Sequence, residues 1–464
     1  MIIKTPSSLK SFANKFSHLL SKSQQKVLPL FLAAIILTKG KRTQAALGSL
    51  HIKKEDCRDR SAVSRLLQSK KFKTRPLCWY GFKKMVERCF RKSQKQRRKS
   101  GTEEKAKWVL LIDGTCTKRG SFTKIANAIQ YKKKDPKKKG KSTKAHTFLM
   151  GLLITDTGER IPIPRLSYYT KDYSRKRGIK FRSQVDLAVM MVRRVSKMLP
   201  KEIDLIVCAD NYFEGRKLFR EANKRGITFI APVDSNRCFA DEETPDISNG
   251  INLYNRGKAL LRKGREELVL VRGEEETASY RRYSKRKATT KERRIFKYRH
   301  EIQNVSGLGK AAIVYSWKSP KSSLHSKSKK PSYKVLVTNN LEMSPEMIIE
   351  YYELRWQVEI YFKEIKSELG PQHYQGTDFE AFEKQIDFTL LAFLFLEWNR
   401  MDALDEEIQK GKPGEAKVLR TTELKRRLER EAFTGDMEFI QKRLGSERGR
   451  RELRKILAEM ISAA

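Results

Sequence analysis

The sequence has 464 residues and a formal net charge of +46 at pH 7, from 100 lysines and arginines against 54 aspartates and glutamates. A chain of this length buries a substantial core and is expected to form roughly two to four domains. So large a charge excess destabilises a compact protein unless a polyanion offsets it, which indicates a nucleic-acid partner. A structural RNA-binding protein would carry the same charge, so the charge predicts the class of partner and leaves the reaction open.

The cysteines and the apolar runs argue against a zinc protein, a secreted protein and a membrane protein. The six cysteines include no C-x-x-C pair and the six histidines form no zinc pattern with them, so we interpret the cysteines as free thiols in a reducing cytoplasm. The longest apolar run, residues 27–37, is well short of the ~20 residues that a membrane span needs. No small-residue cleavage site follows it, so the run predicts a packed helix rather than a signal peptide.

Residues 1–104 are expected to form a helical N-terminal DNA-binding region. Apolar side chains recur at helical spacing in residues 28–37 and 62–67, with a polar, glycine-containing link between these segments. Short basic helices suit a helix-turn-helix that contacts DNA, and an ordinary helical subdomain with a basic face fits the pattern equally well. The nearly all-polar tract 91–105 predicts a linker.

Residues 105–233 are expected to form the first part of a mixed α/β core, because short apolar runs alternate with helical patterns. The expected elements are strands at 108–112, 146–154 and 160–166, a helix at 183–199, a strand at 203–209, a helix at 214–223 and a strand at 227–233. The basic loop 131–144 either contacts DNA phosphates or is simply solvated.

Residues 234–340 are expected to form a β-rich insertion domain with a large positive surface. Short β-type runs at 268–271, 311–317 and 333–337 are separated by very basic stretches such as 280–299. The helical remainder of the chain divides into 341–400, which completes the core, and 401–464, a helical C-terminal region.

The segment that starts at Ser344 predicts one long helix. Ser344 suits the N-cap and Pro345 the first helical position, and Gly370 and Pro371 end the helix. On such a helix one face is apolar and packs into the core, while three polar residues are expected to be solvated (Glu353, Gln357 and Glu364). A separate narrow stripe, walled by Trp356, Ile360 and Phe362, carries four polar side chains: Tyr352, Arg355, Glu359 and Lys366.

Two aspartates add to this stripe. Asp113 and Asp210 each follow a buried apolar strand, at the end where open α/β sheets place their ligand sites. A lone strand-end aspartate is more often a turn or cap residue, but two of them with the inward-facing Glu359 form an all-oxygen set suited to Mg²⁺ or Mn²⁺. Two such ions ~3.5–4 Å apart can activate an attacking hydroxyl and stabilise the leaving oxygen in displacement at phosphorus.

The four stripe residues resemble a known family. With their fixed gaps they match the Y-(2)-R-(3)-E-(6)-K signature of the DDE transposases of the insertion-sequence-four family. LIDGT around Asp113 and CADNYFEGRKLF around Asp210 resemble the motifs that hold the first and second catalytic aspartates. The resemblance covers about 105–233 and 333–400, and is loose over the N-terminal helices.

The resemblance implies an RNase H-like catalytic core that is interrupted by the β-rich insertion. It implies that Asp113, Asp210 and Glu359 are both catalytic residues and ligands of two Mg²⁺ or Mn²⁺ ions. It further implies a DNA-binding role, contacting the phosphates of the transposon end, for three residues: Tyr352, Arg355 and Lys366.

The resemblance also implies a reaction and partners. Members of the family are cut-and-paste transposases that bind double-stranded DNA at terminal inverted repeats and at the target, act as homodimers, and reside in the bacterial cytoplasm with the nucleoid. They commonly excise through a hairpin with a flipped base stacked on an insertion-domain tryptophan, and Trp317 is the candidate, although a tryptophan there also suits the core. The apolar segment 386–398 could serve dimerisation or be buried in the core.

Two other functions fit the same residues. The first is a non-catalytic DNA-binding protein derived from a transposase, which the intact acidic triad argues against. The second is an RNase H-like nuclease that cuts DNA without joining it. The formation of strand-transfer products distinguishes this nuclease from a transposase.

Overall fold

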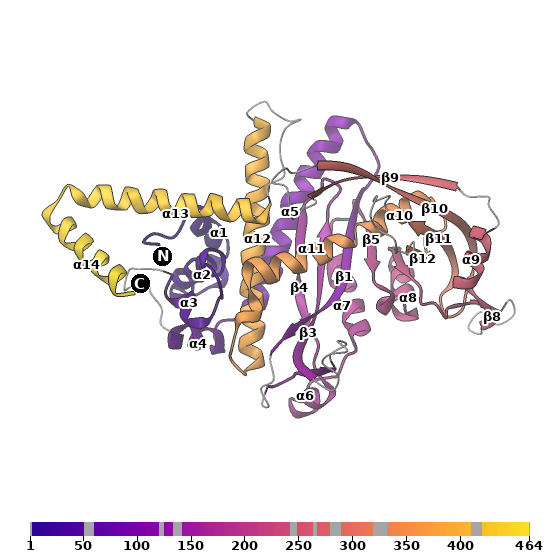
Figure 1. Ribbon diagram of the computed structural model, residues 1–464, viewed down its shortest axis with the longest axis horizontal. Helices are drawn as coiled ribbons and strands as arrows, with labels where there is room; N and C mark the ends of the chain where they lie inside the picture. The colour runs from indigo at the N-terminus through magenta and orange to yellow at the C-terminus, as the bar shows by residue number, and fades with distance from the viewer. Residues whose placement is uncertain are drawn as a thin grey trace, which may run out of the picture.

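One mixed β-sheet forms the centre of the protein. The computed structural model describes residues 2–50, 60–119, 125–132, 142–241, 248–262, 267–278, 289–318, 332–409 and 420–463. Within these residues the strands lie in the order β2-β3-β1-β5-β6-β12-β11-β10-β7-β8, with β4 beside β3 and β9 beside β10. Helices cover the sheet, as Figure 1 shows, so the predicted mixed α/β architecture is confirmed.

The first part of the chain supplies one half of this sheet. Its central strand β1 pairs antiparallel with β3 and parallel with β5, and β5 pairs parallel with β6. Helix α7 leads from β4 into β5, and α8 connects β5 with β6. Ser183 and Asp186 form a capping box at the start of α7, in which the side chain of each accepts a hydrogen bond from the backbone amide of the other. The bounds are β1 (Ala106–Lys118), β2 (Ile129–Lys132), β3 (Ser142–Ile154), β4 (Arg160–Ser167), α6 (Lys171–Lys176), α7 (Gln184–Met198), β5 (Ile203–Ala209), α8 (Arg216–Arg225) and β6 (Thr228–Pro232).

The strands of the expected insertion continue the same sheet. β12 pairs antiparallel with β6, with Leu336 opposite Pro232, so hydrogen bonding runs from the first part of the core into the insertion. The bounds are β7 (Cys238–Ala240), β8 (Ser248–Asn252), α9 (Leu253–Arg262), β9 (Glu267–Ala278), β10 (Thr289–Val305), β11 (Gly309–Lys318) and β12 (Ser332–Thr338). Most of the basic loop predicted at 131–144 and half of the basic stretch 280–299 lie outside the described residues.

The helix predicted from Ser344 is broken, which corrects the expectation of one continuous helix. It consists of α10 (Pro345–Glu353), α11 (Trp356–Glu364) and the π-helical segment η4 (Ile365–Leu369). The Arg355 amide bonds to the Tyr352 carbonyl at 3.0 Å, so the chain makes a tight turn between α10 and α11. Ser344 is the N-cap and Gly370 ends the segment with φ of +57°, as predicted.

The N-terminal helices pack around α12 (Phe379–Gln409). The apolar segment 386–398 lies in α12, which packs against α2, α4 and α5; residues 386–397 are buried within this chain and Trp398 is partly buried. The bounds of the remaining N-terminal helices are α1 (Ser7–Asn14), α2 (Lys22–Leu37), α3 (Gln44–Gly48), α4 (Arg60–Gln68) and α5 (Thr74–Ser100).

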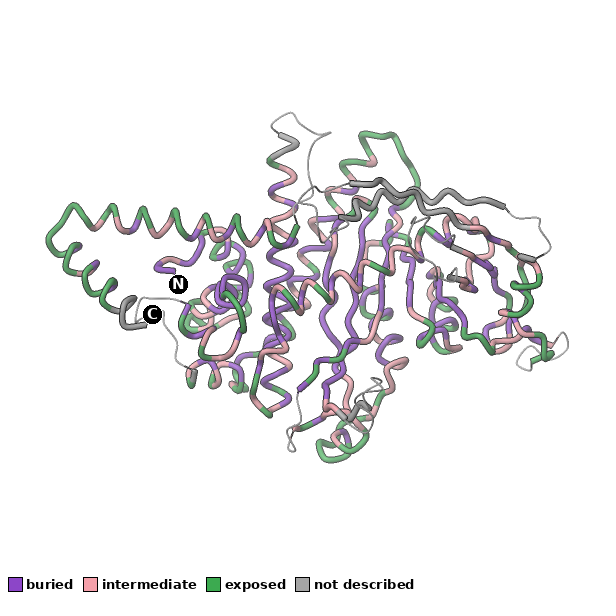
Figure 2. The backbone as a smooth tube through the Cα atoms, viewed as in Figure 1, coloured by how far each residue is buried: buried purple, intermediate pink, exposed green. Residues whose placement is uncertain are grey.

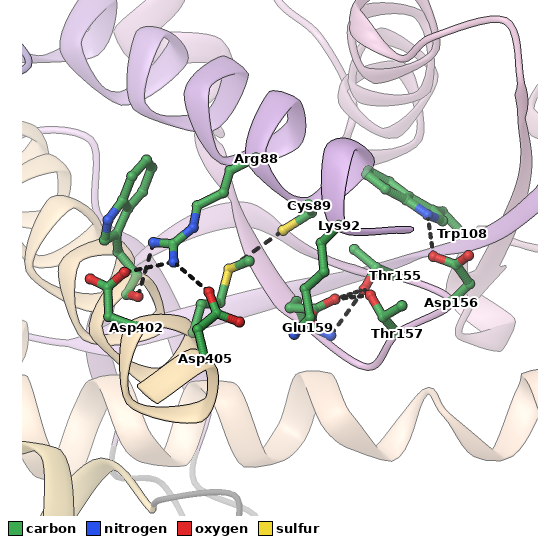
Figure 3. A network of polar contacts seen from close by, with 12 residues as sticks. Arg88, Cys89, Lys92, Trp108, Thr155, Asp156, Thr157, Glu159, Asp402 and Asp405 are labelled. Carbon is green, nitrogen blue, oxygen red and sulfur yellow. Dashed lines mark hydrogen bonds and ion pairs between the residues drawn. The ribbon is translucent and has the colours of Figure 1, made fainter. Parts of the chain in front are cut away.

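The linker predicted at 91–105 is wrong over most of its length, because α5 continues to Ser100. Two of its polar side chains hold the β3–β4 turn. Lys92 pairs with Glu159 at 2.6 Å, as Figure 3 shows. Ser93 donates a hydrogen bond to Asp156 at 2.6 Å. Lys92 and Ser93 are therefore polar because they pair with this turn, whereas most of the other residues of the tract are exposed on the helix or after it.

The C-terminal region is helical, as predicted. Helices α13 (Thr421–Leu444) and α14 (Glu447–Ala463) extend away from the sheet, and most of their surface is exposed (Figures 1 and 2). The carboxylate of Asp436 in α13 accepts backbone hydrogen bonds from Ile3 and Lys4, so this helix holds the N-terminal segment. Among the described helices, none is long and apolar enough to cross a membrane.

Candidate active site

Asp113 and Asp210 lie next to each other where the pairing of β1 with β5 ends: Asp113 is inside β1, which continues to Lys118, and Asp210 follows the last residue of β5. In the parallel pairing of β1 with β5, Ile112 is opposite Ala209, so the two aspartates are the next residues in register. Neighbouring parallel strands are ~4.8 Å apart, which brings the two side chains to the same edge of the sheet. The register therefore agrees with the predicted adjacency of the two aspartates, but the prediction that Asp113 ends its strand was wrong, because pairing with β3 carries β1 on to Lys118.

Each aspartate is held by the backbone amide that follows it. Asp113 accepts a hydrogen bond from the Gly114 amide at 2.7 Å, and Asp210 accepts one from the Asn211 amide at 2.9 Å. Asp210 thereby caps the short 3₁₀ helix η3 (Asn211–Phe213). Gly114 sits against Gln184, whose amide oxygen would lie 2.9 Å from a Cβ at that position, so a side chain there would require the Gln184 side chain to shift.

Glu359 reaches the same region from α11, which packs on β1 and β3. Arg355, one turn earlier, links Glu359 to the strands. Its Nη2 donates to Glu359 Oε1 at 2.7 Å, and its Nη1 lies 3.8 Å from Asp113 Oδ2. The negative charges of Asp210 and Glu359 both raise the pKa of Arg355 against the opposing effect of burial. The guanidinium of Arg355 therefore interacts with three carboxylates that are remote in the sequence.

The environment of Asp113 disfavours its charge. Burial raises the pKa of its carboxyl to about 6, and the charges of Asp210 and Glu359 push it in the same direction, while Arg355 opposes them. Only 22 % of the Asp113 side chain is exposed, compared with 35 % for Glu359. A partly buried cluster of like charges is an arrangement that additional cations would stabilise.

Tyr352 and Lys366 border this cluster. Tyr352 is 4 % exposed, and burial raises the pKa of its hydroxyl, with the charge of Asp210 adding to the effect. Burial lowers the pKa of Lys366, against the charge of Asp113, and its ammonium lies 5.8 Å from the ring centre of Phe362. The four residues of the predicted helical stripe thus lie around one cluster, even though the helix that carries them is broken.

Trp317 lies on the face of the sheet opposite to α10, the helix that carries Tyr352. In β11 it pairs with Lys297 and Tyr333, and it points to the same side as Tyr315, against which α9 packs at Gly257. The opposite face is covered by α10, where Glu346 accepts a hydrogen bond from the Tyr298 hydroxyl. Trp317 is therefore not brought to the carboxylates by any contact of the described residues.

Two further buried or charged residues were not predicted from the sequence, one at the site and one in the segment that follows Asp210. Lys334 of β12 places its ammonium 4.8 Å from the ring centre of Tyr352, so the insertion strands supply a cation to the site. Glu214 is buried after η3 and accepts hydrogen bonds from the Asp234 amide and from Arg237, at 2.9 and 2.8 Å. Nothing in the sequence marks Lys334 among so many lysines, whereas Glu214 stands in the segment around Asp210 that resembles a family motif.

The carboxylates suit a hard divalent cation by their chemistry. Asp113, Asp210 and Glu359 offer only oxygen ligands, and burial makes the charge of Asp113 costly, which are properties of a Mg²⁺ or Mn²⁺ site. Within the described ranges, no three histidine, cysteine, aspartate or glutamate side chains are close enough together to hold a metal ion. The carboxylates are kept apart for a physical reason, because the guanidinium of Arg355 lies between Asp113 and Glu359 and contacts both.

Comparison with protein families identifies the family to which the chain belongs. Residues 104–395 match the family described as "Transposase DDE domain". The chain belongs to this DDE transposase family. The match begins just before β1 and ends inside α12, so it contains all three carboxylates and the insertion strands. A search of curated proteins finds no match.

Membership of the DDE transposase family implies a DNA-binding protein that catalyses phosphoryl transfer, and the family generally uses divalent metal ions. The helices before β1 and the arm formed by α13 and α14 lie outside the matched residues. The fold that positions the three carboxylates is thus the part of the chain that carries the family relationship.

The raised pKa of Asp113 predicts a gain in stability when its charge is removed. The folded protein binds this proton more tightly than the unfolded chain, so the stabilising contribution is full below pH 3.8 and is lost as the pH rises through about 6. At pH 8 we expect the free energy of unfolding of metal-free Asp113→Asn to exceed that of the parent by up to about 3 kcal/mol, so the variant should unfold at a higher temperature. Near pH 4 the two proteins should unfold at the same temperature.

Thermal unfolding in the presence of a chelator measures this difference. Asp204→Asn is the matched control, because Asp204 lies in β5 with 55 % of its side chain exposed and should give no such gain. A gain for Asp113→Asn that persisted at pH 4 would contradict the assigned cause.

Proposed function

We propose that the protein is a cut-and-paste DNA transposase of the insertion-sequence-four family, with an RNase H-like core that holds two Mg²⁺ or Mn²⁺ ions on Asp113, Asp210 and Glu359. One observation carries the proposal. The charges of Asp210 and Glu359 both act on Asp113, although the three residues come from two strands and a helix. The order β4-β3-β1-β5-β6, in which β3 alone runs antiparallel to the other four strands, supports the RNase H-like assignment.

The chain's own residues account for the binding and orientation of the DNA. Ions bound by the carboxylates would activate the attacking water or 3′-hydroxyl and stabilise the leaving oxygen. Arg355 neutralises Asp113 and Glu359 in the metal-free protein, and bound cations would release its guanidinium to hold a phosphate. Lys366 and Lys334 supply further cationic groups beside Asp113 and Tyr352, and burial keeps the Tyr352 hydroxyl protonated as a donor.

The partners follow from the charge and the family. The DNA comprises the terminal inverted repeats and the target duplex, and two copies of the chain bridge the two ends. The N-terminal helices are proposed to bind the end DNA, residues 234–340 to form the insertion domain, and residues 105–233 with 341–400 the catalytic core. Trp317 remains a candidate for stacking on a flipped base of a hairpin end, but it would have to act from the α9 face of the sheet.

The test is a cleavage and joining assay on a plasmid that carries the gene with its native flanking DNA. We expect excision that depends on Mg²⁺, followed by strand-transfer products on a second plasmid. Cleavage without joined products would favour the nuclease, and binding without cleavage would favour the non-catalytic DNA-binding protein. A hairpin at the excised end would appear as a fragment that denaturing gels resolve at twice the single-strand length.

A further inference from the structure

Buried polar contacts hold the C-terminal end of α11. Glu364, its last residue, lies 2.9 Å from Nη1 of Arg160 in β4 and accepts a hydrogen bond from Thr421 Oγ1, also at 2.9 Å. The Glu364 side chain is only 20 % exposed, so the prediction that it is solvated was wrong. Thr421 is the first residue of α13, a helix that starts beside α12 and extends away from the sheet (Figure 1).

The same contacts continue into α12. Arg160 Nη2 lies 2.6 Å from Glu397 Oε1, and Arg400 Nη1 lies 2.5 Å from Glu397 Oε2. Arg400 also bonds to the hydroxyl of Thr421, at 3.3 Å. Two arginines and two glutamates therefore balance in charge, which offsets the cost of burying them. This network joins the end of α11 to β4, α12 and the first residue of α13.

A second contact joins α13 to the π-helical segment. Lys425, one turn after Thr421, lies 3.1 Å from the carboxylate of Glu368 and 3.3 Å from its carbonyl oxygen. Glu368 belongs to η4, which also carries Lys366. We call Thr421 and Lys425 the α13 clamp, because these two side chains hold α11 and η4.

The backbone of α11 explains why a clamp matters there. The helix has only nine residues, with the tight turn at Arg355 before it and the π-helical segment after it. A regular helix transmits its orientation along the backbone, but irregular turns at both ends leave a short helix to be oriented by side-chain contacts. Glu359 lies at the centre of this short helix.

We propose that the α13 clamp is a positioning device for the active site, which sets the orientation of α11 and η4 and hence of Glu359 and Lys366. The inference rests on the proposed function of Glu359 as a metal ligand. Thr421 and Lys425 touch neither metal nor DNA in this scheme; they act through Glu364 and Glu368. The C-terminal helix, outside the family match, thereby becomes part of the catalytic machinery.

The test compares Mn²⁺ binding by the full-length parent and by variants without DNA, measured from the electron paramagnetic resonance signal of free Mn²⁺. For the double variant Thr421→Val with Lys425→Met we expect Mn²⁺ affinity to fall about tenfold, as for residues that orient metal ligands. Thr421→Ser keeps the hydroxyl and should bind Mn²⁺ like the parent. Arg427→Met is the matched control, because Arg427 of α13 pairs only with the exposed Glu406 in the described contacts.

The outcomes separate the clamp from the proposed function. Parental Mn²⁺ affinity in the double variant, or an equal loss in Arg427→Met, overturns the clamp alone. Failure of the parent to bind Mn²⁺ overturns the proposed function and the clamp with it. If the double variant does not fold, Thr421→Val alone is compared with Thr421→Ser, and equal Mn²⁺ affinity of these two folded variants overturns the clamp.

Discussion

Asp113→Asn, Asp210→Asn and Glu359→Gln should each abolish cleavage of transposon-end DNA while leaving the binding of that DNA intact. Each change replaces a charged oxygen ligand with a neutral amide of similar shape, so the cations that drive displacement at phosphorus are lost or misplaced. Loss of several kcal/mol of transition-state stabilisation corresponds to a rate reduced about a thousandfold or more. Single-turnover cleavage and end-binding affinity measure the two parts of the prediction.

Asp204→Asn serves as a control here too, since it removes a carboxylate from β5 at the other end of the strand. Its cleavage rate should equal that of the parent. Retained cleavage in any one of the three site variants would remove that residue from the assigned catalytic set, and unfolding of Glu359→Gln would show that Glu359 acts in folding instead.

Binding of end DNA should weaken steeply with salt. A chain with a net charge of +46 contacts many phosphates and releases their counterions, so its affinity should fall about a thousandfold or more between roughly 50 and 200 mM salt. Fluorescence anisotropy of a labelled end duplex over this range gives the slope. A flat dependence would contradict the argument from charge.

One lysine at the active site allows a sharper version of this measurement. Lys366→Met removes one proposed phosphate contact and should reduce the slope of log affinity against log salt by about one. Lys105→Met changes the same charge near the start of β1, where Lys105 pairs with exposed Asp204 at 3.6 Å. A slope reduced equally by both variants would remove Lys366 from the DNA contact.

The catalytic strands could be predicted because their patterns are local. A continuous apolar run ends at Asp113 and another at Asp210, and a run of this kind is typical of a buried parallel strand. The stripe on the helix was also visible, since Arg355 and Glu359 are four residues apart and contact each other in an ordinary helical turn. These features gave the identities of the candidate ligands.

Features that depend on distant contacts could not be predicted. Much of β10 falls in a basic stretch that was expected to separate the β-type runs of the insertion, yet it is a strand that pairs with β9, β11 and β7. The polar end of α5 suggested a linker because its partners, Asp156 and Glu159, lie more than fifty residues away. Glu364 was expected in water for the same reason, since Arg160 and Thr421 meet it only in the folded chain.

The central claim is that Asp113, Asp210 and Glu359 share divalent cations. The most direct measurement is the anomalous diffraction of Mn²⁺ in crystals of the protein with end DNA that cannot be cleaved. The account predicts Mn²⁺ within ligand distance of all three carboxylates, with Arg355 turned from Asp113 toward a phosphate. Mn²⁺ bound elsewhere, with Arg355 still bridging Asp113 and Glu359, would contradict it.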